Sequence, residues 1–419
     1  MKRRGVRWLS AGLLVGASAG LMEISSLVDP AVSSADDAAD TALILGYAET
    51  PTPMQSYVDQ VMSVFIDPKS PYFPDQPVYP GYAPVVVSTP EGADYSTVLT
   101  QGAPLLDQAI QDHLSTSDDH VVVWGYSESS SIATQELINL GKEGNPNQDN
   151  LSFVLLENLN NPNGGYLERF PELAGTPFPA TPADTPYDVT IYTVQYSASS
   201  DYPLYTSNLL ADENAMAGFV ELHPLLLPGY PSAFDFSSLN NAVLENVSSA
   251  DVNTDYYLIP IQNLPLLDFS RDLGGNAMAD LMQPDMRVLI DLGYDYTSNA
   301  DVLTPASMAS PDYTPAVVDE YLLAGANQGI IAALVDVGVL QKSDLVDMYP
   351  YVPDVKDLIA GALTTNDPTA ATADATASAN ALVEALTASD NPLAPALLTF
   401  LPGFADDLAG YFGNFLPSV

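Results

Sequence analysis

The amino-acid sequence predicts an α/β protein with a mostly parallel central sheet, flanking helices and a helical C-terminal extension. One observation is a series of short apolar runs rich in β-branched residues, which is typical of parallel strands buried on both faces. A second is that helix-patterned segments lie between several of these runs, which implies right-handed crossovers. The expected strands are 41–46, 85–87, 121–124, 151–156 and 189–196, with 256–261 as a further candidate.

Each element has its own signal in chain order. Residues 41–46 (Thr-Ala-Leu-Ile-Leu-Gly) are apolar and end at glycine, and 95–114 carry a helical pattern. The run 121–124 (Val-Val-Val-Trp) is followed by a helix over 130–141, with Gly141 in the C-cap position.

Two long connections interrupt this alternation. Residues 159–187 are rich in Asn, Pro, Gly and Thr, so they either cover a site or form a passive surface excursion. Residues 224–250 carry several Leu, Tyr and Phe side chains, which would suit a lid or acyl-chain wall and equally ordinary packing.

The character of the chain changes near Pro315. Helical patterns over 317–339 and 343–362 precede an Ala/Thr-rich stretch, 364–379, that reads as a linker or a poorly packed helix. An amphipathic tail, 393–415, is expected to dock on the core, because it holds two aspartates and no Lys or Arg to contact an anionic membrane. The expected division is 1–35 signal peptide, 36–314 α/β domain and 315–419 helical extension.

Charge and composition exclude some functions. The 419 residues carry a net charge of −42 with only 11 Lys and Arg, which excludes non-specific binding to nucleic-acid phosphates. There is no cysteine, so disulfides and thiolate sites are excluded.

The N-terminus resembles an export signal. Met1–Arg7 is basic, Trp8–Met22 is apolar but short for a membrane span, and Ser33-Ser34-Ala35 fits a cleavage site. We therefore expect an exported protein, secreted or associated with the cell envelope. An uncleaved N-terminal anchor is the alternative.

Residues 125–129 (Gly-Tyr-Ser-Glu-Ser) lie between an expected buried strand and an expected helix. This is the context of a nucleophile elbow, in which a serine sits on a sharp strand-to-helix turn. The turn needs small residues two positions before and after the serine, and Gly125 and Ser129 supply them. Ser127 is the predicted nucleophile, with a plain strand-to-helix turn as the alternative.

The histidines restrict the choice of a general base. In α/β-hydrolase order the base follows the serine and the acid lies between them. Of His113, His120 and His223, only His223 follows Ser127, so it is the predicted base.

The acid should follow a strand. Asp201 comes shortly after the run 189–196 and is the predicted acid, with Asp212 second. The oxyanion hole is predicted from the N–H of Glu128 and one N–H of the loop that holds Gly46 and Tyr47.

These residues resemble the PE-PPE domain family of mycobacteria, a serine-hydrolase version of the α/β-hydrolase fold. Matching stretches cover roughly residues 41–310 and are listed here in order: 43–46 with Pro51-Thr52-Pro53, 125–129, 161–165 with Arg169-Phe170, 196–203, 214–218 leading to His223, and 291–294. The resemblance implies a triad of Ser127, Asp201 and His223.

The sequence departs from the family pattern in three places. No PE or PPE segment precedes the matching stretch, and the expected signal peptide stands in its place. Ser197-Ala198 replaces a pair that is often acidic and glycine. Glu128 replaces an uncharged residue and is expected to face solvent.

The expected function is hydrolysis of lipid or acyl esters through an acyl-enzyme, without metal or cofactor. One alternative, also implied by the resemblance, is an acyltransferase that moves acyl groups onto trehalose-type glycolipids of the envelope. Another is a non-catalytic envelope protein on a hydrolase scaffold. The expected partners are an acyl ester or glycolipid and, peripherally, the cell envelope.

Overall fold

The structure is a computed structural model that describes residues 40–92, 94–114, 119–172, 178–227, 232, 234–345 and 351–417. The expected signal peptide lies outside these residues. Ala38–Val419 form one compact unit, so the helical extension belongs to the same unit as the sheet.

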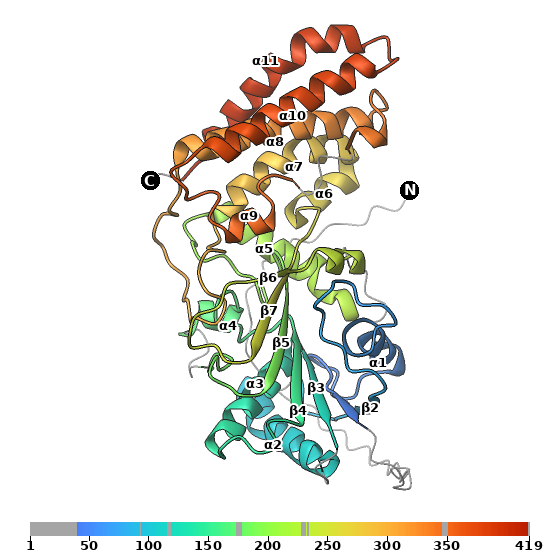
Figure 1. Cartoon of the computed structure of the whole chain (residues 1–419), viewed down its shortest axis with the longest axis vertical. Coiled ribbons are helices and arrows are strands. Elements are labelled where there is room, and N and C mark those ends of the chain that lie inside the picture. Colours follow the sequence, from blue (N-terminus) through green and yellow to red (C-terminus); the bar gives the residue numbers. More distant parts are fainter. Residues whose placement is uncertain are drawn as a thin grey trace, which may run out of the picture. The chain divides into compact units, whose positions relative to one another are not determined.

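The centre of this unit is a mixed sheet in which the described residues contribute seven strands (Figure 1). Their order is β2-β1-β3-β4-β5-β7-β6, and every pairing is parallel except that of β6 with β7. The strands are β1 (Thr41–Ile44), β2 (Ala83–Val86), β3 (Val121–Tyr126), β4 (Leu151–Leu156), β5 (Asp188–Val194), β6 (Val243–Leu244) and β7 (Thr254–Ile259). The predicted α/β class and its mostly parallel sheet are confirmed.

Strand β3 shows why these runs are apolar without alternation. Val121 and Val123 pack into the core on one face of the sheet, and Val122, Trp124 and Tyr126 pack into the core on the other. Because successive side chains point to opposite faces, a strand covered on both sides needs apolar residues at every position.

Helices cover both faces of the sheet. The helices α2 (Tyr95–His113) and α3 (Glu128–Lys142) supply residues to one core. The other core includes residues of α1 (Gln55–Val61), α7 (Asn276–Asp291) and α8 (Pro315–Asp336). The remaining helices are α4 (Tyr166–Arg169), α5 (Leu209–Glu221), α6 (Pro265–Gly274), α9 (Val355–Ile359), α10 (Thr369–Ala388) and α11 (Ala394–Gly413), with short helices η1 (Met62–Ile66), η2 (His223–Leu226), η3 (Phe236–Asn241) and η4 (Lys342–Leu345).

Two expectations for the C-terminal part were wrong. The Ala/Thr-rich stretch lies mostly in α10, a packed helix that buries Ala371, Ala375, Leu382 and Leu386. The single helix expected over 343–362 is replaced by η4 and α9, and Pro353 between them cannot continue a helix. No described helix combines the length and the apolar character needed to cross a membrane.

The buried carboxyl of Asp285 makes stability depend on pH. Its two oxygens have no hydrogen-bond partner among the described residues, and the side chain lies against Gly325 of α8. Burial raises the pKa of Asp285 well above its usual value. The carboxyl is therefore protonated in the folded state and ionised in the unfolded state near neutral pH. This stabilisation is fully present below the unfolded pKa of about 4 and is lost as pH rises toward the folded pKa.

We expect the thermal unfolding midpoint to be higher at pH 5 than at pH 8, because burial also raises the pKa of Glu136 to about 8 and of Asp201 to about 7. The variant Asp285→Asn should show a smaller difference between the two pH values, which calorimetry can measure. An unchanged difference would mean that Asp285 does not titrate between the folded and unfolded states.

Candidate active site

Ser127 sits in a sharp turn between β3 and α3. Its backbone has φ 58° and ψ −122°, a conformation that side-chain-bearing residues rarely adopt. A Cβ on Gly125 would lie 3.0 Å from the Ser129 carbonyl oxygen, which explains why the turn needs a small residue there. The strand-turn-helix arrangement predicted for residues 125–129 is present.

The predicted base lies against this serine. His223 begins η2, directly after α5, and its Nε2 is 2.8 Å from Oγ of Ser127. The rings of Tyr126 and Phe219 both stack on the imidazole, with centroid distances of 5.4 and 4.8 Å. The Tyr126 hydroxyl also donates to the His223 carbonyl. Tyr126 is the residue before the serine, so the strand that carries the nucleophile also holds the histidine.

The carboxylate beside the histidine belongs to Glu157. This residue directly follows β4, has φ 53° and is fully buried. Its Oε2 is 3.1 Å from Nδ1 of His223. The Val194 N–H (3.0 Å) and the Ser200 hydroxyl (2.7 Å) donate to Oε1, and the Ser197 and Ser199 hydroxyls donate to Oε2.

These donors keep Glu157 ionised. Burial opposes its ionisation, but the hydrogen bond and charge of His223, with the bonds from Ser197 and Ser199, outweigh burial and lower the pKa of Glu157. Since Ser199 gives its hydrogen to Glu157, its oxygen can accept from Nδ1 of His223, 3.0 Å away. The proton of a neutral imidazole then resides on Nδ1, which leaves Nε2 free to accept from Ser127.

The prediction that Asp201 lies against His223 is corrected by this geometry. One oxygen of Asp201 accepts from the Tyr196 N–H (2.8 Å) and from the Tyr296 hydroxyl (3.0 Å), and no hydrogen bond to His223 occurs among the described residues. The bond to Tyr196 closes the turn after β5 and draws the carboxylate back to the strand end. Burial raises the pKa of Asp201 to about 7, with Glu157 adding to the rise. The second choice, Asp212, lies in the first turn of α5, where its pKa is raised to about 6 by burial.

The sequence held one signal for Glu157 that was not used. It is the first residue after the apolar strand 151–156, and a parallel sheet places its active site at the carboxyl ends of its strands. Only the folded turn 195–201 shows that three serine hydroxyls converge on this carboxylate.

The residues predicted for the oxyanion hole lie around the same turn. The N–H of Glu128 is the first of α3 and so has no intrahelical acceptor. The Gly46 carbonyl accepts from the Ser129 hydroxyl (2.6 Å), and the Tyr47 carbonyl accepts from the Thr50 N–H. A Cβ on Gly46 would lie 1.9 Å from the Thr50 carbonyl oxygen. The oxyanion role of Glu128, Gly46 and Tyr47 stays a prediction.

The side chain of Glu128 does not face solvent, contrary to the expectation. It is 6% exposed and accepts from the Gly92 N–H at 2.8 Å. Burial raises its pKa, and burial also raises the pKa of nearby Glu91 to about 7. The loop 89–92 therefore binds this carboxylate and holds it away from the histidine.

Ser129 connects the turn to the first strand, so its loss should be measurable. Its buried hydroxyl accepts from the Tyr126 N–H (3.0 Å) and donates to the Gly46 carbonyl. Ser129→Ala leaves both groups without this partner, and we expect a loss of about 1–3 kcal/mol in the free energy of unfolding, measured by urea titration. Ser96→Ala on exposed α2 is the control, and an equal loss there would contradict the role of Ser129.

The fold and this site define a class, the α/β-hydrolase type with a serine on a nucleophile elbow. Residues 74–295 match the PE-PPE domain family, and the chain belongs to that family. It is 39% identical over 336 residues to "Esterase PE16" of Mycobacterium tuberculosis, covering 75% of this chain and 60% of that protein. It is 40% identical over 332 residues to "PE family protein PE3" of the same organism, covering 75% and 67%.

A more distant relative bears the name of an acyltransferase. The chain is 26% identical over 294 residues to "Diacyltrehalose acyltransferase Chp2" of Mycobacterium tuberculosis, covering 64% of this chain and 79% of that protein. The chain thus spans about 60% of the length of the esterase relative.

Proposed function

We propose that this protein is an exported serine hydrolase that cleaves carboxylic esters of lipids or acyl groups through an acyl-enzyme. The observation that carries the proposal is the 2.8 Å contact between Ser127 Oγ and His223 Nε2 at the end of β3. The relative named as an esterase supports the reaction class.

In the proposed mechanism, His223 accepts the proton of Ser127 as Oγ attacks the ester carbonyl. Glu157 stabilises the resulting imidazolium through Nδ1, and the Glu128 N–H stabilises the oxyanion together with an N–H of the loop at Gly46 and Tyr47. His223 then returns the proton to the leaving alcohol, which departs and leaves an ester on Ser127. Water, activated by the same histidine, releases the acid and restores the serine.

A fluorophosphonate probe tests the nucleophile directly, since it transfers its phosphonyl group to an activated serine with loss of fluoride. Mass spectrometry of the labelled protein is expected to place the adduct on Ser127. In parallel, p-nitrophenyl esters of graded chain length should be hydrolysed. A folded protein that takes no label and cleaves no ester of any length would be a non-catalytic hydrolase scaffold, and the proposal would be wrong.

Acyl transfer is the second candidate, and the relative named as a diacyltrehalose acyltransferase supports it. A cavity of about 840 Å³ beside Leu222, the residue before His223, has polar lining residues suited to a sugar, including Asn240, Gln262 and Asn263. If an acceptor hydroxyl resolves the acyl-enzyme, adding a trehalose glycolipid should yield an acylated product by mass spectrometry and reduce the free acid. Asn263→Leu should then lower transfer more than hydrolysis.

Export through residues 1–35 is part of the proposal, supported by the basic and apolar pattern of the N-terminus. Mass spectrometry of protein from the culture medium should find a chain that begins at Asp36. A cell-bound chain that retains Met1–Arg7 would indicate the uncleaved anchor.

A further inference from the structure

The solvent-facing side of α5 is apolar. Leu209, Met216 and Val220 lie on one stripe of this helix and are 69%, 39% and 63% exposed. The opposite side of α5 is already buried, through Ala211, Asn214, Ala215 and Gly218. A surface helix of a soluble protein normally has a polar outer face, so an exposed apolar stripe marks an interaction surface.

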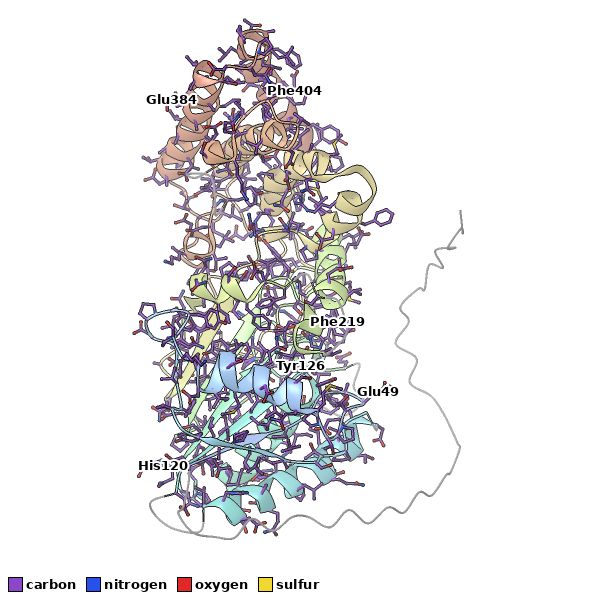
Figure 2. All side chains as sticks on the ribbon, turned by 90° about the vertical axis from the view of Figure 1, so that its right-hand side faces the viewer. Glu49, His120, Tyr126, Phe219, Glu384 and Phe404 are labelled. Carbon is purple, nitrogen blue, oxygen red and sulfur yellow. The ribbon has the colours of Figure 1, made fainter. Side chains whose placement is uncertain are left out.

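This stripe continues to the active site. Phe219, next to Val220, is 43% exposed, and its ring stacks on His223 at 4.8 Å with an interplanar angle of 19°. Figure 2 shows Phe219 near Tyr126, the residue before the nucleophile, while His120 at the start of the same strand lies well away from both. A molecule that covers α5 therefore borders the catalytic imidazole.

The helix is held firmly against the site. Gly218 lies so close to the turn after β5 that a Cβ there would be 2.0 Å from the Tyr196 carbonyl oxygen. Asn214 accepts from the Leu266 N–H of α6 at 3.2 Å. The stripe thus has a fixed position relative to Ser199 and His223.

Charge decides what can bind there. Residues 209–227 contain Asp212, Glu213 and Glu221 but no Lys or Arg, and the whole chain carries a charge of −42. An anionic membrane and a second copy of this chain would both be repelled. An apolar surface flanked by acidic groups instead suits a partner with hydrocarbon and no net charge.

We propose that the α5 stripe of Leu209, Met216 and Val220 docks on the surface of uncharged lipid aggregates and so presents their acyl esters to Ser127. This inference rests on the proposed function for its substrate, but the docking itself is measured without turnover.

The test uses the full chain carrying Ser127→Ala, so that vesicles are not consumed. Flotation with phosphatidylcholine vesicles should recover the protein with the lipid, and vesicles rich in phosphatidylglycerol should recover less. Adding Leu209→Gln and Val220→Gln is expected to lower partitioning to phosphatidylcholine about tenfold, because two exposed aliphatic side chains no longer leave water. The matched control, Val383→Gln with Leu393→Gln, changes one Val and one Leu that are 43% and 58% exposed on α10 and beside α11.

The same paired substitutions in the active chain separate the two proposals. Both pairs should hydrolyse soluble p-nitrophenyl butyrate like the parent, and only the α5 pair should lose activity on emulsified long-chain esters. Failure of all chains on the soluble ester would contradict the proposed function but not the docking. Docking is contradicted by unchanged flotation of the α5 pair, by an equal loss in the control pair, or by sedimentation showing that the α5 pair breaks a dimer.

Discussion

Ser127→Ala is expected to lower kcat/KM for p-nitrophenyl esters by about 10⁶-fold, the size of effect seen when a triad nucleophile is removed. The reason is that His223 would have no hydroxyl to deprotonate at its Nε2, 2.8 Å away. Initial rates with pre-cleared substrate measure the residual activity. Ser130→Ala is the matched control, because Ser130 lies one turn further on and its hydroxyl donates to the Ser127 carbonyl. It should stay within about tenfold of the parent.

The backbone at Ser127 adds a second readout. Its φ of 58° with ψ of −122° is costly for a residue with a Cβ, by about 1–3 kcal/mol, and much less so for glycine. Ser127→Gly should therefore be as inactive as Ser127→Ala and yet unfold at a higher temperature. If Ser127→Ala keeps the activity of the parent, the nucleophile is another residue and the proposed mechanism is wrong.

Glu157→Gln is expected to lower kcat by about 10³- to 10⁴-fold with little change in KM. The amide cannot stabilise the imidazolium, and its NH₂ group can hold His223 in the tautomer whose Nε2 is protonated. It also faces the Val194 N–H and three serine hydroxyls that now donate to a carboxylate. Steady-state kinetics, with circular dichroism to check the fold, measures the effect.

Asp201→Asn is the matched control for Glu157→Gln, because it removes the other buried carboxylate after a strand end. Its side-chain oxygen can still accept from the Tyr196 N–H and the Tyr296 hydroxyl, so we expect less than about tenfold loss of kcat. A large loss in Asp201→Asn with a small one in Glu157→Gln would restore Asp201 as the acid that the sequence predicts.

The comparison of these two carboxylates shows where sequence reasoning reached its limit. Both follow strands, and strand order places both at the same edge of the sheet. The side-chain direction depends on the backbone after each strand: Glu157 has φ 53°, and Tyr196 has φ 66°. Two left-handed residues without glycine leave no mark in the sequence, so their effect on the carboxylates could not be foreseen.

The sequence by itself determined the fold class and the reacting pair. Apolar runs with β-branched residues are required when both faces of a strand are buried, the elbow needs Gly125 and Ser129 to close, and only His223 follows Ser127. Those constraints are local or arise from scarcity, and both can be read along the chain.

Tertiary structure decided the acid, the environment of Glu128 and the apolar outer face of α5. Each depends on which groups from distant segments come together in a low-dielectric interior: three serines around Glu157, the Gly92 N–H at Glu128, and the packing of Gly218 on the Tyr196 carbonyl. Hydrogen bonds to a buried charge are strong but carry no periodicity, so the sequence could predict that a carboxylate would hold His223 but not which one.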